Sequence, residues 1–243
     1  MKLLDRRIAM WSARHPIASF LMRAFQNRAD TQVIDEPYYA HFLKQTGYDH
    51  PGRAAVLNGQ PSDIFRIEAA LSAPLEPGKD IFYQKHISNH IYAGMDQSWL
   101  DGMTNAFLIC EPLSCVVPHA ETVGDVTLAD LGLQQQLALF EYLTDRQGEA
   151  PVVVDRCDIM RQPEATLRKL CNALEISFDS SMLSWPAGPR ESDGPWAPYQ
   201  YQRIEASTGF DRPDVPEVKL NDQLLYLADL AMPLYERLAR HRI

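Results

Sequence analysis

Apolar runs of strand length alternate along this 243-residue chain with segments that repeat apolar residues at helical spacing. Such alternation is typical of βαβ units, which build a parallel sheet covered by helices. A chain of this length with 46% hydrophobic residues can bury a core of the required size. The sequence therefore predicts an α/β fold in one domain over residues 1–243. The five predicted strands are Arg7–Trp11, Gln32–Ile34, Ile81–Gln84, Ala106–Ile109 and Val152–Val154.

Helices are predicted between and after these strands from apolar periodicity and from proline at first-turn positions. A stretch rich in proline, glycine and tryptophan, Ser184–Pro198, is predicted to be an ordered irregular loop. The predicted helices are Ile17–Asn27, a segment opened by Asp35–Tyr39, Asp63–Leu71, His86–Trp99, Leu128–Tyr142, Pro163–Leu174 and Leu220–Arg240.

Charge and cysteine usage exclude several classes of protein. The formal net charge of -9 argues against a nucleic-acid coat and against a polybasic membrane anchor. The segment Met1–Arg7 is charged too early for a secretory signal, and no apolar run has membrane length. We therefore expect a cytoplasmic protein without metal, nucleic acid or membrane as partner. The cysteines lack zinc-type spacing and are expected to be buried free thiols, at Cys110, Cys115, Cys157 and Cys171.

A polar turn without glycine lies between the first predicted strand and the first predicted helix. Its helix would present unpaired N–H groups and the positive end of its dipole at the carboxyl edge of the sheet, where ligands of such folds bind. The turn and the helix start provide hydroxyl and basic groups around this point, which suit a phosphate or sulfate site. Spacing alone fits exposed loop residues equally well, so both interpretations stay open. The four candidate ligands are Ser12, Arg14, His15 and Ser19.

A nucleotide-triphosphate P-loop and a dinucleotide fold are both disfavoured, because each needs glycines in this turn and the first glycine is Gly47. The residues resemble instead the sulfotransferase family, in particular a bacterial branch of sulfotransferase-like proteins. The resemblance rests on MWSARHPIASFLMRAFQNRADTQVIDEPYYAHFL, NAFLICEP, VTLADLGLQQQLALF and the block VVVDRCDIM to EASTGF. It implies a three-layer P-loop-like fold with a mainly parallel central sheet flanked by helices.

The resemblance also implies a chemistry and a set of binding positions. Such enzymes move a sulfuryl group from 3'-phosphoadenosine-5'-phosphosulfate (PAPS), and the turn Ser12–Ser19 would bind the 5'-phosphosulfate. The family's ligands of the 3'-phosphate, an arginine and a serine, map to Cys110 and Pro118, which provide neither a permanent charge nor a hydroxyl. A second nucleotide-contact loop is expected at Ser207, Thr208 and Gly209.

The catalytic candidates follow the third predicted strand. We expect His86 to act as the base and Lys85 to stabilise charge, with His90 four residues on along the same helix face. The alternative is a helix start with a surface neighbour. Asp35 and Glu36 could orient an acceptor or Arg14, but they are interpreted as helix caps, because acidic residues at helix starts usually are.

The function predicted is PAPS-dependent transfer of a sulfuryl group to a hydroxyl of a small acceptor. Two alternatives stay open, because the expected 3'-phosphate ligands are absent: a degenerate binding protein without catalysis, and a transferase whose nucleotide lacks a 3'-phosphate. A basic side chain that reaches this point, such as Arg156 or Arg203, would favour the first function.

Overall fold

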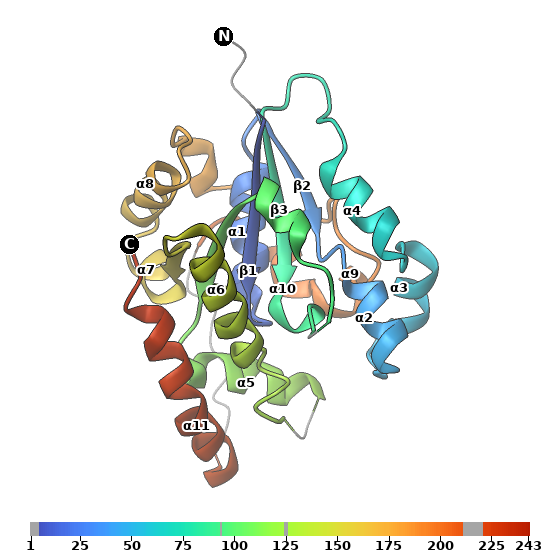
Figure 1. The fold of residues 1–243 in the computed structure, drawn as a ribbon, viewed down its shortest axis with the longest axis vertical. Helices are drawn as coiled ribbons and strands as arrows, with labels where there is room; N and C mark the ends of the chain where they lie inside the picture. The colour runs from blue at the N-terminus through green and yellow to red at the C-terminus, as the bar shows by residue number, and fades with distance from the viewer. Residues whose placement is uncertain (1–4, 93, 124–125, 211–220) are drawn as a thin grey trace.

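Five parallel strands form one sheet at the centre of the protein (Figure 1). The computed structural model describes residues 5–92, 94–123, 126–210 and 221–243. The strands lie in the order β2-β3-β1-β4-β5, so β1 and β3 are central. All the strand pairings are parallel, as the βαβ pattern predicted. The strands are β1 (Arg6–Ser12), β2 (Thr31–Asp35), β3 (Ile81–Ile87), β4 (Thr104–Ile109) and β5 (Val152–Asp155).

Helices cover both faces of the sheet and connect its strands. The α-helices are α1 (Pro16–Gln26), α2 (Tyr39–Thr46), α3 (Arg53–Gly59), α4 (Ile64–Ser72), α5 (Pro112–Val123), α6 (Leu133–Gln147), α7 (Arg156–Arg161), α8 (Pro163–Ala173), α9 (Ala197–Gln200), α10 (Gln202–Ala206) and α11 (Asp222–Ala239). Three short 3-10 helices are η1 (Ser88–His90), η2 (Ser98–Gly102) and η3 (Ser180–Leu183).

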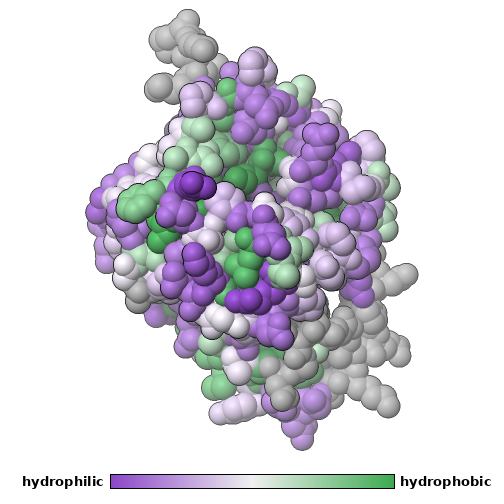
Figure 2. Space-filling model, turned by 90° about the vertical axis from the view of Figure 1, so that its right-hand side faces the viewer, coloured by the Kyte–Doolittle hydropathy of each residue, from purple (hydrophilic) through white to green (hydrophobic). Residues whose placement is uncertain are grey.

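Side chains that alternate along the strands divide the core into two layers. On β1, Ile8 and Met10 pack with α1 and α8, whereas Ala9 and Trp11 pack with α4 and α6. The predicted α/β fold is thereby confirmed. Hydrophilic residues cover much of the outer face over α2, α3 and α4, with hydrophobic residues in separate patches between them (Figure 2).

Most predicted elements match the structure to within a few residues, including all five strands and the irregular loop at 184–198. The predicted helix Leu128–Tyr142 begins later, because Gly132 has a φ of 71° immediately before α6. The helix predicted from Leu220 begins at Asp222, and Leu220 itself lies outside the described residues. Five α-helices of the described residues, α3, α5, α7, α9 and α10, were not predicted.

The helix predicted over His86–Trp99 was wrong. Strand β3 continues through Lys85 and His86 to Ile87, and in the described part of the segment that follows, the helices are the short η1 and η2. The polar residues there do not end the strand, because β2 and β1 provide backbone partners on both sides up to Lys85 and Ile87. This correction decides where the catalytic candidates lie.

Candidate functional site at the carboxyl edge of the sheet

The turn after β1 adopts the predicted strand, turn and helix. His15 is the N-cap of α1, and its Nδ1 accepts a hydrogen bond from the Ile17 N–H at 3.0 Å. The His15 side chain also interacts with the Cys110 thiol. His15 itself therefore satisfies one of the unpaired N–H groups that were predicted to bind an anion.

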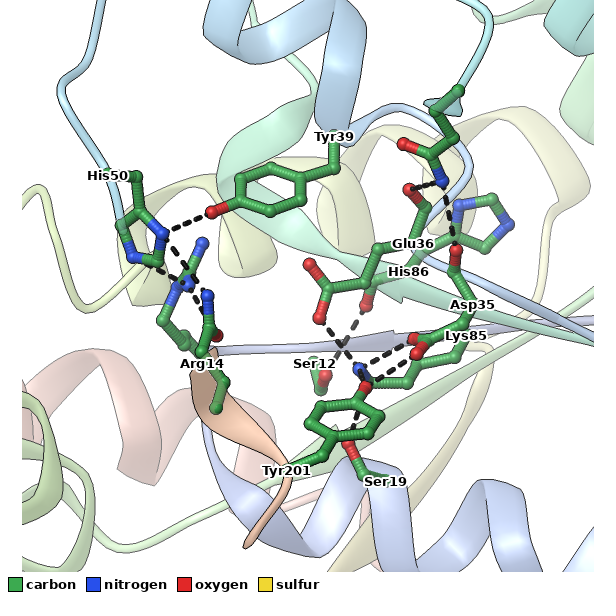
Figure 3. A network of polar contacts seen from close by, with 12 residues as sticks. Ser12, Arg14, Ser19, Asp35, Glu36, Tyr39, His50, Lys85, His86 and Tyr201 are labelled. Atoms are coloured by element: carbon green, nitrogen blue, oxygen red, sulfur yellow. Dashed lines mark hydrogen bonds and ion pairs between the residues drawn. The ribbon is translucent and has the colours of Figure 1, made fainter. Parts of the chain in front are cut away.

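Lys85 extends from β3 into a buried polar network (Figure 3). Its Nζ donates to Asp35 Oδ1 at 2.8 Å, to Glu36 Oε1 at 2.7 Å and to the Tyr201 hydroxyl at 2.9 Å. Burial alone would lower the pKa of Lys85, but Asp35 and then Glu36 raise it well above its usual value. The ammonium group is therefore charged at neutral pH, and all three of its protons are in use.

The Tyr201 hydroxyl joins Ser19 to this network (Figure 3). Ser19 Oγ donates to it at 3.0 Å, and it donates to Asp35 Oδ2 at 2.5 Å. Two residues predicted to contact ligand, Ser19 and Lys85, thus donate to the same phenol oxygen. The Tyr201 hydroxyl oxygen therefore has three polar partners: Ser19, Lys85 and Asp35.

Asp35 and Glu36 are not helix caps, in contrast to the prediction. Helix α2 begins after Tyr38, which makes no side-chain cap bond, and both carboxylates bind Lys85 instead. Burial alone would raise the pKa of Glu36, but Lys85 and then Arg14 lower it to about 2. The Glu36 carboxylate is therefore anionic, and its Oε2 is buried without a partner among the described residues.

Arg14 lies beside this carboxylate. Its Nη1 contacts His50 Nε2 at 3.1 Å and donates to Gln200 Oε1 at 3.4 Å, while its guanidinium lies over the Tyr39 ring. Burial alone would lower the pKa of Arg14, but Glu36 and then Tyr39 together outweigh it, so that the pKa is raised. Arg14 is a fixed cation of the site.

A cavity of about 270 Å³ connects these groups. The turn before α1 forms one wall, and the segment 199–204 forms the opposite wall. Its lining residues are Arg14, His15, Pro16, Ser19, Glu36, Lys85, Ile87, Tyr199, Gln200, Tyr201, Gln202, Arg203 and Ile204. Four of the predicted site residues therefore meet in one pocket: Arg14, His15, Ser19 and Lys85.

His86 lies on the other face of the sheet from Lys85, because neighbouring residues of a strand point in opposite directions. Its ring stacks on Trp11 with centroids 4.3 Å apart, and its Nε2 contacts Gln84 Oε1 at 3.2 Å. Burial lowers the pKa of His86 to about 3. The predicted base does not line the pocket, and His90, in η1, stacks on Tyr39 rather than sharing a helix face with it.

The remaining predicted ligands also lie elsewhere. Ser12 Oγ donates to the His86 carbonyl at 3.3 Å, so it joins β1 to β3. Ser207 Oγ accepts from Trp185 Nε1, the Thr208 carbonyl accepts from the Trp185 N–H, and Gly209 pairs with Ser184. The segment Ser207–Gly209 thus connects two loops beside the core and does not line the pocket.

The position expected to hold a 3'-phosphate has a different chemistry. Cys110 is only 2% exposed, and burial raises its pKa well above the usual value, so it is an uncharged thiol. The Pro118 side chain lies outside the described residues. Nearby, Arg156 at the start of α7 reaches Ser114 in the first turn of α5, with Nη1 to Oγ at 3.5 Å. A cation and a hydroxyl are therefore in contact here, and the hydroxyl lies four residues after Cys110 in the chain.

A parallel sheet of this order, with a polar pocket at its carboxyl edge behind a strand, turn and helix, is typical of a P-loop-like α/β fold. A family model described as a sulfotransferase domain matches residues 6–242, and the chain belongs to this family.

Solved structures with the same fold include two sulfotransferases. That of Alicyclobacillus acidocaldarius has a TM-score of 0.61 at 14% identity, covering 98% of this chain and 96% of that one. A sulfotransferase domain from the curacin biosynthetic pathway has a TM-score of 0.50 at 13% identity, covering 93% and 97%. At these identities the likeness shows the fold alone.

Two relatives are closer in sequence, both from Arabidopsis thaliana. Branched-chain-amino-acid aminotransferase-like protein 1 is 36% identical over 234 residues, which cover 96% of this chain and 42% of the relative. Protein 2 of the same name is 35% identical over 235 residues, covering 96% and 41%. The chain thus spans about two fifths of the length of these relatives.

No helix in the described parts of the chain combines the length and apolar character needed to cross a bilayer. Within the same residues, no three His, Cys, Asp or Glu side chains are grouped so that they could hold a metal ion.

Proposed function

We propose that the protein transfers a sulfuryl group from PAPS to a hydroxyl group of a small acceptor, in the cytoplasm. The observation that carries the proposal is the pocket in which Arg14, Lys85 and the start of α1 face the Glu36 carboxylate. Sulfuryl transfer needs cations around the transferred group and an acceptor for the hydroxyl proton. This pocket combines both on rigid elements.

Each pocket residue has a role in this proposal. Arg14 and the N-terminus of α1 bind the phosphosulfate, as a permanent cation and a helix dipole do. The acceptor oxygen attacks sulfur, and the bond from sulfur to the bridging oxygen breaks. Lys85 donates to the oxygen that leaves with the electron pair. Glu36 Oε2 takes the proton of the acceptor hydroxyl, so Glu36 replaces His86 as the proposed base.

The ion pair explains how a carboxylate with a low pKa serves as a base. Lys85 lowers the pKa of Glu36 while it donates to Oε1. When the Lys85 ammonium donates this hydrogen bond to the bridging oxygen instead of to Oε1, the pKa of Glu36 rises towards that of an ordinary carboxyl group. The base is therefore released at the step that needs it.

We also propose that Arg156 and Ser114 bind the 3'-phosphate in place of the residues absent at 110 and 118. The contact between Arg156 Nη1 and Ser114 Oγ supports this, because both are strong phosphate ligands on adjacent helix starts. Arg203 is exposed and lines the pocket, where it would add a further cation.

One observation favours a second function, in which the protein binds an anion or a partner without catalysis. The protons of Lys85 and Ser19 and the N–H groups of Ile17 and Ala18 at the start of α1 already have partners inside the protein. A third function, transfer from a nucleotide without a 3'-phosphate, is favoured by the uncharged Cys110.

Calorimetric titration with 3'-phosphoadenosine-5'-phosphate (PAP) and with adenosine monophosphate separates these functions. We expect PAP to bind and adenosine monophosphate to bind much more weakly, after which a screen of hydroxylated acceptors with PAPS should yield sulfated product. Binding of neither nucleotide would favour the non-catalytic function. Equal binding of both would overturn PAPS specificity and favour a donor without a 3'-phosphate.

A further inference from the structure

The backbone of Glu36 has a conformation that side-chain-bearing residues rarely adopt. Its φ is 40°, and in the described residues only Glu175 is likewise a non-glycine residue with positive φ. This region of φ is unfavourable for a residue with a Cβ, so neighbouring structure must hold it. Because Glu36 lines the pocket, whatever holds this turn also fixes the carboxylate.

Local contacts provide part of the support. The Glu36 N–H donates to the Lys85 carbonyl at 2.9 Å, and the Glu36 carbonyl accepts from the Tyr39 N–H at 3.0 Å. The first bond continues the pairing of β2 with β3, and the second closes the turn. Neither bond ties the turn to any element besides β3 and α2.

Gln60 provides a connection from outside the turn. Its Nε2 donates to the carbonyl of Asp35 at 3.3 Å and to that of Glu36 at 3.1 Å. Its Oε1 accepts from the Ala40 N–H at 3.3 Å, at the start of α2. The three partners fix the orientation of the amide, because a flipped amide would face two carbonyl oxygens with its own oxygen.

The location of Gln60 makes this connection informative. It is the C-cap residue of α3, and it lies 24 residues after Glu36 in the chain. Its side-chain hydrogen bonds go to backbone atoms of the turn and of α2, and it does not line the pocket. Its side chain therefore serves the turn and not the ligand.

The backbone conformation at Glu36 determines where its carboxylate lies. Oε1 accepts from Lys85 at 2.7 Å, and Oε2 is buried without a partner in the described parts of the chain. A relaxed turn would rotate the side chain away from Lys85, since a change in φ moves Cβ and all atoms beyond it. Lys85 would then keep Asp35 and Tyr201 as partners and lose the third.

We propose that Gln60 is a positioning residue whose amide holds the strained turn at Glu36, so that this carboxylate bridges Lys85 and the pocket. Its catalytic meaning rests on the proposed function, in which Glu36 is the base. The arrangement itself can be tested without catalysis.

The test follows the Lys85 ammonium protons by nitrogen-edited NMR of the purified chain, which holds six lysines. Their exchange with water is expected to be slow, because all three donate to buried acceptors. Gln60→Met keeps the side-chain length and removes its hydrogen bonds. We expect the exchange rate of Lys85 to rise about tenfold or more in this variant, as in local opening of a protected group.

Two comparisons make the result specific. Gln32 lies on β2, the strand that ends at Asp35, and its side chain accepts a hydrogen bond from the Glu76 N–H. Gln32→Met removes this bond and should leave the exchange rate of Lys85 unchanged. In a Glu36→Gln background, Gln60→Met should add little, because Gln60 acts through Glu36. Gln60→Glu keeps an acceptor for Ala40 but lacks the amide donors, and it should behave as Gln60→Met does; it also serves if Gln60→Met does not fold.

Unchanged Lys85 exchange in both folded Gln60 variants would overturn the proposal. So would an equal acceleration by Gln60→Met with and without the Glu36 carboxylate, which would indicate general loosening. None of these readouts needs sulfuryl transfer. If PAP fails to bind the wild-type protein, the proposed function is lost, whereas the positioning of Glu36 by Gln60 is judged by Lys85 alone.

Discussion

The charge on Lys85 is held inside the protein by two carboxylates and a phenol, with only 2% of the residue exposed. Removing one partner of a buried ion pair leaves the others without compensation, and this usually destabilises a protein more than the pair stabilises it. Lys85 pairs with both Asp35 and Glu36, so both carboxylates lose their compensating charge when Lys85 is removed, whereas Lys85 keeps one carboxylate when Glu36 is removed. This asymmetry can be measured.

Lys85→Met should lower the free energy of unfolding by about 3–5 kcal/mol, because Asp35 and Glu36 then remain buried as unpaired acids. Glu36→Gln should lower it less, since Lys85 keeps Asp35 and Tyr201. Urea unfolding at pH 7 gives both values. Equal losses in the two variants would contradict the central position of Lys85.

Arg156 provides a second prediction for a single residue. Arg156→Ala should weaken PAP binding by about tenfold to a hundredfold, which is the value of one or two charge-assisted phosphate contacts. Binding of adenosine monophosphate should not change, because it lacks the 3'-phosphate. Arg161→Ala, at the exposed far end of the same helix, is the matched control. Equal weakening of both nucleotides would place Arg156 outside the 3'-phosphate site.

At the scale of elements, helix α1 depends on an unusual cap. Ser, Thr, Asp and Asn are the common N-caps, whereas here the ring of His15 accepts from the Ile17 N–H. His15→Ala should lower stability by about 1 kcal/mol, the usual value of a lost N-cap bond. His15→Ser should retain most of the wild-type stability, because a serine hydroxyl can accept the hydrogen bond from the same N–H. Denaturant unfolding of both variants tests this, and equal losses would indicate that the contact with Cys110, and not the cap, is what matters.

The element most informative about prediction from sequence is β3. All five strands were predicted, because strand-length apolar runs bounded by polar residues are local signals. The continuation of β3 through Lys85 and His86 was not, because their polar character and the histidine at 90 suggested a helix start. Lys85 is tolerated there because Asp35 and Glu36 from the neighbouring strand neutralise it, and pairing across strands is not visible in one sequence.

The same reason separates the site residues that were predicted from those that were missed. Arg14, His15 and Ser19 belong to a local motif of strand, turn and helix, so their place in the motif and their chemistry were enough to propose them. Glu36 and Gln60 owe their roles to contacts between distant segments. A polar pair directly after a buried strand was the one signal for Glu36, and it was interpreted as a helix cap. Gln60 carries no such signal.

At the scale of the whole molecule, two buried histidines link stability to pH. Burial lowers the pKa of His86 and of His90 to about 3, and His90 faces Glu36, Arg14, Lys85 and His86. Both are neutral when folded and gain protons near pH 6.5 when unfolded. Their contribution to stability is complete above pH 6.5 and is lost as the pH falls towards 3. Glu36 adds to this loss below about pH 4.5, whereas Asp35, whose pKa is raised by burial, opposes it.

The expected outcome is a free energy of unfolding that falls by up to about 3 kcal/mol per pH unit below pH 6, since each histidine contributes about 1.4 kcal/mol per unit. His90 is the better residue for the test, because its ring stacks on Tyr39 and both its nitrogens lack a partner in the described residues. His90→Phe preserves the stacked ring and removes the titration, so it should halve the slope between pH 6 and 5 in urea unfolding series. A slope equal to that of the wild type would mean that His90 is not neutral in the folded protein, and the acid sensitivity would then have to come from His86 or from the carboxylates around Lys85.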